Sequence, residues 1–395
     1  MAFDLVLTGA RVLDPSQDID RVTDVAFAGG KVAALGGGLG AQAAEVRDCR
    51  GAIVTPGLID LHTHVYDGGT SLSVDPLHLA ATGGLTTLVD AGSAGPGNFA
   101  GFRRHVIEPA PMRILAYLNI SFAGIYAFSG RVMVGESHDY RLLSPVDALE
   151  VARTNRDVIP GIKVRVGHIA SGTLGIIPLN VGLEVADVLG SPMMVHIDYP
   201  PPTLAEVLAL MRPGDILTHC FRPFPNSPVI GERIRPELIA ARERGILFDI
   251  GHGMGSFSFA VARIMLAQGF MPDTISSDVH SLCIGGPAFD LITTMSKFLC
   301  LGVPLGEVVR AATVNAAKAL QRPDLGTLKP GSAGDASIIT VESGRFDYID
   351  STGEILRGEH RIAAQGIVIG GTLWSANANQ DAAAGGESSL TPCVD

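Results

Sequence analysis

The chain has 395 residues, of which 47% are hydrophobic and 17% are charged, and its 29 basic and 40 acidic side chains give a formal net charge of −11. The charged fraction lies below the ~25% typical of globular proteins, so the composition excludes a mainly disordered chain. No lysine- and arginine-rich run is present, which argues against nucleic acid or an anionic membrane as partner, because both need clustered cations.

The location of the protein in the cell is predicted from targeting segments and from the cysteine pattern. No segment reaches the ~18 uninterrupted apolar residues of a membrane span, and Asp4 interrupts what would be the apolar core of a secretory signal. The five cysteines are scattered and form no Cys-x-x-Cys pair, so a disulfide framework is not expected. We therefore expect a cytoplasmic protein.

The pattern of apolar and turn residues changes twice along the chain. Residues 1–57 read as short β segments with Gly, Pro and Asp at the turns, and residues 321–375 return to this pattern. We expect the two ends to form one small β-sandwich domain, because neither has enough strands to bury a face alone. Residues 376–395 are small and polar without periodicity, which predicts a flexible tail.

The middle of the chain, residues 58–320, alternates short apolar runs with stretches of helical periodicity such as 146–157 and 236–245. The apolar runs are residues 58–64, 85–92, 112–120, 159–166, 192–198, 214–220, 245–251 and 273–278. Eight consecutive βα units over about 260 residues predict an α/β fold of the (β/α)8 TIM-barrel type.

The first candidate site residues are His62 and His64 at the end of the first run, LIDLHTH. Side chains alternate along a strand, so both imidazoles lie on one face and can converge on one cation. Taken alone, the pair could equally be a surface pair or two core histidines with hydrogen-bond partners.

Further ionisable residues stand at the ends of other runs. His196 closes the fifth run, His219 closes the sixth and Asp278 closes the eighth, while Lys163 lies within the fourth. Ionisable groups are rare in apolar strands unless they are paired or bound to metal, and the carboxyl ends of barrel strands form the reaction site. These residues therefore indicate a metal site at that rim.

Lys163 differs from the others, because an ammonium group would be repelled by a nearby dication. Burial in an apolar strand favours the neutral amine, which can react with carbon dioxide to form a carbamate. The alternative is an inward lysine paired with a carboxylate.

This set of residues resembles the amidohydrolase superfamily, specifically its binuclear branch with a carboxylated lysine. The matching segments are Pro56–His64, GIKVR at 161–165, the later His and Asp residues, NAA at 315–317 and LGTLKPGSAGDASI at 325–338. The segments GIKVR and SSDVHS are more similar in sequence to the deacetylase-like group than to dihydroorotases and other cyclic-amide enzymes.

The resemblance implies two divalent cations, with zinc as the expected metal. It implies that His62, His64 and Asp278 hold one cation and that His196 and His219 hold the other. The carbamate of Lys163 and a hydroxide would bridge the two, and Asp278 would act as general acid and base toward the metal-activated hydroxide.

Residues that select the substrate are harder to identify. Arg165 lies on the same face as Lys163 and could bind a carboxylate, or it could face solvent or a helix. His280, two residues after Asp278, could contact substrate or orient the aspartate, or it could pack in its loop. Tyr66 is a third candidate, and the long connection at 121–144 is a candidate lid or partner contact.

We therefore expect a metal-dependent hydrolase that cleaves an amide or ester bond of a small acyl compound carrying a carboxylate. The alternatives are a cyclic-amide hydrolase of dihydroorotase or hydantoinase type and, more remotely, a catalytically silent scaffold. The expected partner is a small-molecule substrate, with neither nucleic acid nor membrane, and association into a homo-oligomer is compatible with the low charge.

Overall fold

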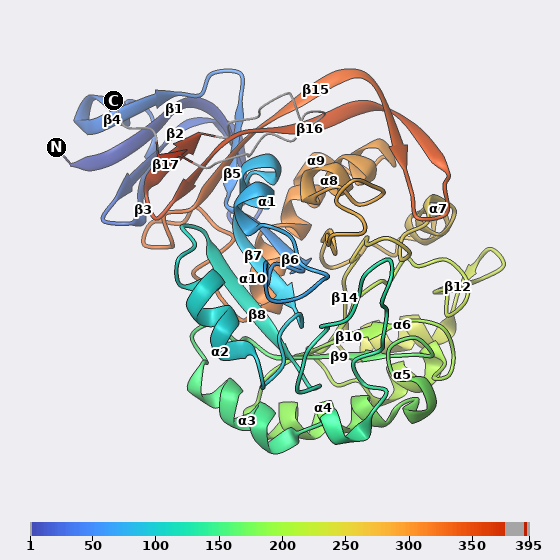
Figure 1. The fold of residues 1–395 in the computed structure, drawn as a ribbon. Coiled ribbons are helices and arrows are strands. Elements are labelled where there is room, and N and C mark those ends of the chain that lie inside the picture. The colour runs from blue at the N-terminus through green and yellow to red at the C-terminus, as the bar shows by residue number, and fades with distance from the viewer. Residues whose placement is uncertain (1, 376–390, 393–395) are drawn as a thin grey trace.

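The computed structural model describes residues 2–375 and 391–392 (Figure 1). It has an α/β barrel and, beside it, a β-sheet to which both ends of the chain contribute. In the described part of the chain, no helix is long and apolar enough to cross a membrane.

The strands of the barrel follow the chain in order around it. Seven of them form one parallel sheet, with each strand beside the next in sequence. They are β6 (Leu58–Thr63), β7 (Leu85–Ala91), β8 (Arg113–Asn119), β9 (Ile162–Val166), β10 (Met193–Ile197), β11 (Ile216–Leu217) and β14 (Leu247–Phe248). Each lies inside one of the apolar runs that the sequence analysis identified.

The eighth run closes the barrel through two single bridges. Thr274 pairs in parallel with Asp249 beyond β14, and Val279 pairs in parallel with Thr63 of β6. Backbone hydrogen bonds join the same edges, including one of 2.7 Å from Asp278 N to His62 O. The predicted barrel is therefore confirmed, with its last strand held by bridges on both sides.

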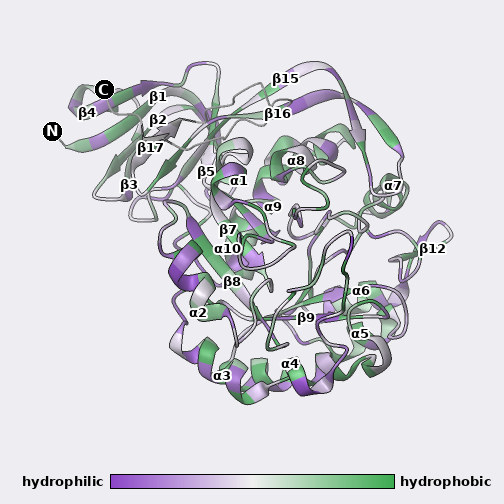
Figure 2. Cartoon of the chain, in the orientation of Figure 1, coloured by the Kyte–Doolittle hydropathy of each residue, from purple (hydrophilic) through white to green (hydrophobic). Residues whose placement is uncertain are grey.

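Helices cover the outside of the barrel. They are α1 (Pro76–Gly83), α2 (Phe99–Phe102), α3 (Pro145–Thr154), α4 (Ile177–Leu189), α5 (Leu204–Leu210), α6 (Pro236–Glu243), α7 (Phe259–Ala267), α8 (Leu291–Cys300), α9 (Leu305–Ala311) and α10 (Val314–Ala319). The outer helices α3 and α4 carry both hydrophilic and hydrophobic residues in Figure 2, as helices with one face on a sheet do. Helix starts follow local chemistry, since Ser144 caps α3 and Thr203 forms a capping box with Glu206 at α5.

The second sheet joins the two ends of the chain. Its strands are β1 (Phe3–Asp14), β2 (Ile19–Ala28), β3 (Lys31–Gly36), β4 (Ala43–Asp48), β5 (Ile53–Pro56), β15 (Ala336–Ile349), β16 (Ile355–Ile369), β17 (Thr372–Ser375) and β18 (Thr391–Pro392). β5 is the junction, because it pairs with β1 on one side and with β15 on the other. These strands form one continuous sheet, and a two-stranded ribbon of β12 (Val229–Ile230) and β13 (Arg233–Ile234) stands apart.

The predicted domain limits, 1–57 with 321–375 against 58–320, stay a prediction. Most of the tail predicted at 376–395 lies outside the described residues, and Thr391–Pro392 pair with β17.

The hairpin of β15 and β16 extends beyond the other strands of the second sheet and arches over the barrel (Figure 1). Its strands pack on α8, where the Ile362 backbone N donates a 2.9 Å hydrogen bond to Ser296 Oγ. The tip of the hairpin also receives a hydrogen bond from a buried lysine of α8, since Lys297 Nζ donates to Ile349 O at 2.8 Å. This contact ties the second sheet to the barrel.

Candidate active site

His62, His64 and Asp278 form a compact group at the carboxyl ends of the first and last barrel strands. One ligand atom from each lies within 4.8 Å of the others, and all three side chains are buried. Asp278 Oδ1 lies 3.1 Å from His62 Nε2 and 3.2 Å from His64 Nε2. Although burial opposes ionisation, the two imidazoles hold the pKa of Asp278 well below its usual range. The group therefore presents an ionised carboxylate between two ring nitrogens.

Lys163 lies beside this group in β9. Its Nζ is 3.4 Å from His62 Nε2, and its side chain is fully buried. Burial lowers the pKa of Lys163 to about 7, so a substantial neutral fraction exists at physiological pH. The backbone of Gly92 packs against the aliphatic part of this lysine, and a Cβ atom at Gly92 would lie 2.6 Å from Lys163 Cγ.

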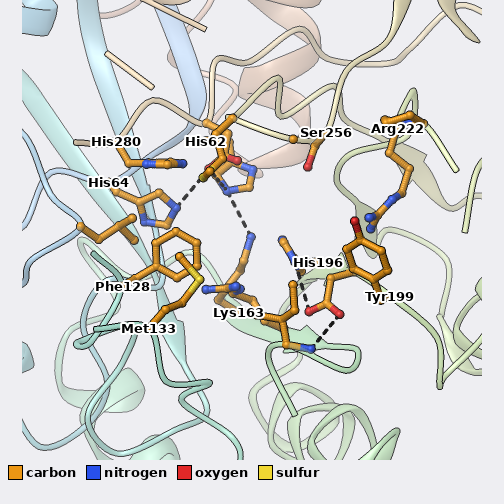
Figure 3. Close-up of a pocket in the computed structure, with 18 of the residues that line it drawn as sticks. His62, His64, Phe128, Met133, Lys163, His196, Tyr199, Arg222, Ser256 and His280 are labelled. Atoms are coloured by element: carbon orange, nitrogen blue, oxygen red, sulfur yellow. Dashed lines mark hydrogen bonds and ion pairs between the residues drawn. The ribbon is translucent and has the colours of Figure 1, made fainter. Parts of the chain in front are cut away.

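His196 and His219 form a second pair, from the ends of β10 and of the strand that contains β11. His196 Nδ1 lies 2.6 Å from His219 Nε2. Burial lowers the pKa of both imidazoles well below the usual value, so both rings are neutral, as metal ligation requires. His196 Nε2 is buried without a hydrogen-bond partner among the described residues. Figure 3 shows His62, His64, Lys163 and His196 directed toward the same cavity.

Hydrogen bonds on the outer side of the rings fix their orientation. His62 Nδ1 lies 2.8 Å from Thr218 Oγ1, and Thr218 in turn donates to Asp249 Oδ2 at 2.8 Å. His64 Nδ1 lies 2.9 Å from Ser93 Oγ. His219 Nδ1 lies 2.7 Å from the carbonyl oxygen of Gly251. These contacts leave the Nε2 atoms of His62, His64 and His219 facing the site, as outer partners of metal-binding histidines do.

Two site residues have unusual backbone angles. His219 has a φ of 66° and Asp278 has a φ of 48°, in the left-handed region that favours glycine. Such angles cost free energy and occur where a side chain must be held in one direction. They mark the points at which the sixth and eighth strands turn into their loops.

The donor set fits divalent cations. Neutral imidazole nitrogens and one ionised carboxylate are typical ligands of zinc and similar metals. His196 Nδ1 and His219 Nε2 converge, as do the nitrogen and oxygen atoms around Asp278, and a cation would stabilise such a buried cluster of lone pairs. The residues present therefore suit a metal centre.

The site opens into a cavity of about 270 Å³. Besides the residues above, its wall includes Phe128 and Met133 from the long connection after β8, Phe224 from the loop after β11, and Met254 from the loop after β14. The connection predicted as a candidate lid thus supplies part of the cavity wall.

The three predicted substrate residues have different surroundings. Arg165 and His280 line the cavity. Arg165 Nη1 lies 3.6 Å from Glu136 Oε2, and its guanidinium stacks over Phe128. Tyr66 is not among the residues that line the cavity, since its ring stacks on Phe102 and its hydroxyl donates to Asn98 O. A role of Tyr66 in substrate binding stays a prediction.

Several residues of this site escaped the sequence analysis. Asp249 accepts hydrogen bonds from Thr218, Thr274 and Ser276, and so connects three strands behind His62. The signal was available, because Asp249 is an ionisable residue in an apolar run. Arg222 also lines the cavity, but it lies in a loop where no strand pattern points to it.

Comparisons with known proteins find relatives over most of the chain. Residues 191–358 match the amidohydrolase family. The chain is 39% identical over 354 residues to a deacetylase of Agrobacterium fabrum, an alignment that covers 88% of this chain and 86% of the relative. A crystal structure described as a dihydroorotase superposes with a TM-score of 0.86 at 37% identity and covers 94% of this chain and 98% of the other.

A second crystal structure, described as an adenine deaminase, superposes with a TM-score of 0.88 at 29% identity, over 94% of this chain and all (100%) of the other. The similarity thus extends over the barrel and the second sheet together. On these matches, the chain belongs to the amidohydrolase family and is a hydrolase.

Proposed function

We propose that this chain is a metal-dependent deacetylase or amidohydrolase that cleaves an amide or ester bond of a small acyl compound bearing a carboxylate. The observation that carries the proposal is a group of six side chains at one end of the barrel. Five of them line one cavity, namely His62, His64, Lys163, His196 and Asp278, and the sixth, His219, contacts His196. The deacetylase relative from Agrobacterium fabrum supports the same class of reaction.

The proposed ligand assignment uses two cations, with zinc as the expected metal. His62, His64 and Asp278 would hold one and His196 and His219 the other, with Lys163 serving both as a carbamate. The neutral fraction of Lys163 supports this last step, because its amine nitrogen can bond to the carbon of carbon dioxide and release one proton. When bound, the cations lower the pKa of a water molecule and polarise the substrate carbonyl.

Asp278 is the proposed general base and general acid. Its carboxylate is ionised and lies at the centre of the group, where it can accept a proton from the attacking water. It then returns that proton to the departing nitrogen or oxygen of the substrate. His62 and His64 hold the carboxylate in position on one side.

The cavity supports a small substrate with both polar and apolar parts. His280 and Arg165 are proposed to contact the substrate, and Phe128, Met133 and Met254 offer apolar surface. Burial lowers the pKa of His280 to about 4, so it would act as a neutral hydrogen-bonding group. The cytoplasmic location and a homo-oligomeric state stay predictions.

Turnover of zinc-loaded protein against matched panels tests the proposal. N-acyl amino acids, O-acetyl hydroxy acids and cyclic amides such as dihydroorotate form the panels. We expect hydrolysis within the first two. Ring opening of dihydroorotate without hydrolysis of the acyl compounds would instead show that the chain is a cyclic-amide hydrolase. No turnover, with less than about half an equivalent of metal per chain, would favour a silent scaffold.

A further inference from the structure

Arg222 is a buried cation whose polar atoms lack partners. Its exposed fraction is 6%, and it lies in the loop that follows β11, three residues after His219. Nε and Nη1 are buried and have no hydrogen-bond partner among the described residues. A buried guanidinium without a partner is costly, and such groups are retained where a ligand supplies the missing acceptors.

The position of Arg222 relative to the metal site is fixed. Its backbone N donates a 3.1 Å hydrogen bond to the carbonyl oxygen of His219. The guanidinium lines the same cavity as the metal ligands, on the side where Tyr199 and Ser256 also lie (Figure 3). A substrate group bound by Arg222 would therefore lie in the cavity that the proposed metal ligands line.

The acidic side chain that acts on Arg222 already has hydrogen-bond partners of its own. Asp198 acts on Arg222 electrostatically, but the Asp198 carboxylate already accepts hydrogen bonds from the backbone N atoms of Ile169 and Ala170, at 3.1 and 3.0 Å. Arg165 differs in this respect, because its guanidinium faces Glu136 and stacks over Phe128. Arg165 leaves one buried donor, Nε, without a hydrogen-bond partner, whereas Arg222 leaves two and forms no ion pair among the described residues.

We infer that Arg222, rather than Arg165, binds the carboxylate of the substrate and so sets the preference of the enzyme for anionic acyl compounds. A guanidinium offers a fork of N–H donors that matches the two oxygens of a carboxylate. The inference rests on the proposed function for the reaction, but it makes its own claim about binding.

Calorimetric titration of the zinc-loaded full-length protein tests the inference without relying on turnover. The probes are non-hydrolysable analogues of compounds in the first two panels, in which a methylene group replaces the nitrogen or oxygen of the scissile bond. They are used in matched pairs that differ only in carboxylate against hydroxymethyl. Wild-type protein should bind the carboxylate member of at least one pair more tightly. Arg222→Met should weaken that binding about 10- to 100-fold and leave the hydroxymethyl member nearly unchanged, and Arg222→Lys should be intermediate.

Two comparison variants sharpen the result. Arg165→Met should retain the preference for the carboxylate member, and Arg104→Met, which changes an exposed arginine, should behave as wild type. Arg222→Met should also have a Tm equal to or above that of wild type without ligand, because it removes an unpartnered buried charge.

The outcomes separate this inference from the proposed function. If Arg222→Met keeps the preference, or if wild type shows none in any pair, the inference is wrong even where the protein hydrolyses the compounds. If carboxylates bind through Arg222 but no acyl compound is hydrolysed, the inference stands and the proposed reaction fails.

Discussion

Gly253 packs directly against the carboxylate of Asp278, since a Cβ atom added to Gly253 would lie 2.2 Å from Asp278 Oδ2. Gly253 has a φ of 53°, and its backbone N donates a 2.9 Å hydrogen bond to Ser277 O. The residue therefore cannot give way without moving the strand that carries Asp278. A glycine in the loop after β14 thus sets the place of the proposed catalytic carboxylate at the end of the eighth strand.

Gly253→Ala should displace Asp278 and lower turnover by at least tenfold. The reason is steric, because no real Cβ approaches an oxygen atom that closely, and a positive φ adds strain for alanine. Gly306→Ala is the matched control, since a Cβ there meets open space on helix α9 and alanine favours helix by up to about 1 kcal/mol. Equal activity of the two variants would show that Gly253 does not position Asp278.

Asp278→Asn tests proton transfer at the site. The amide is nearly isosteric and can still lie between His62 and His64, so bound metal should remain above half of the wild-type content. Turnover should fall by about 10²- to 10⁴-fold, because the amide cannot accept and return a proton. Steady-state kinetics and elemental analysis of one preparation provide the readouts, and turnover close to that of wild type would remove the role assigned to Asp278.

Thr218→Val tests the hydrogen-bonded chain behind His62. Valine has the shape of threonine but cannot bridge His62 Nδ1 and Asp249 Oδ2, which Thr218 joins with two 2.8 Å contacts. Loss of an outer partner of a metal-binding histidine typically weakens metal affinity about 10- to 100-fold. Competition with a zinc chelator measures this change. Thr82→Val, on helix α1 away from the site, serves as the control.

Lys297 predicts a pH dependence of stability. It is fully buried on α8, and burial lowers its pKa to about 7 from the usual 10.5. The unfolded chain therefore binds more protons than the folded chain between these values, so this group favours folding increasingly as pH rises from 7 toward 10.5. This contribution of Lys297 to the free energy of unfolding is lost as pH falls to about 7.

Lys297→Met should remove this dependence. Compared with the variant, wild type should gain up to about 1.4 kcal/mol of unfolding free energy per pH unit within that window. Denaturant titrations at several pH values measure the difference, with the exposed Lys318→Met as the control for loss of one charge. A pH-independent difference between wild type and Lys297→Met would show that the lysine stays protonated when buried, held by its bonds to His252, Pro287 and Ile349.

The barrel could be predicted from the sequence because each of its strands is a short apolar run, which is a local feature of the chain. Seven of the eight apolar runs contain a strand. Side-chain alternation places His62 and His64 on one face of β6 and Lys163 and Arg165 on one face of β9, and all four line the cavity. Alternation stops where a strand stops, and β6 ends at Thr63. Strand alternation therefore could not predict the direction of the Tyr66 side chain, because Tyr66 lies beyond the end of β6.

The remaining parts of the site depend on how loops fold in three dimensions. Glu136 reaches Arg165 from the connection after β8, and Arg222 reaches the cavity from a loop after a two-residue strand. Neither position follows from periodicity, because a loop has no fixed repeat. The partners of Asp249 likewise come from separate strands and appear only once the strands are in register.

Anomalous diffraction at the zinc absorption edge, from crystals of the zinc-loaded protein, tests the binuclear centre most directly. The account predicts two peaks, one within bonding distance of His62, His64 and Asp278 and one at His196 and His219, with density for a carbamate extending from Lys163 Nζ between them. Absence of both peaks at these residues, with Lys163 unmodified, would contradict it.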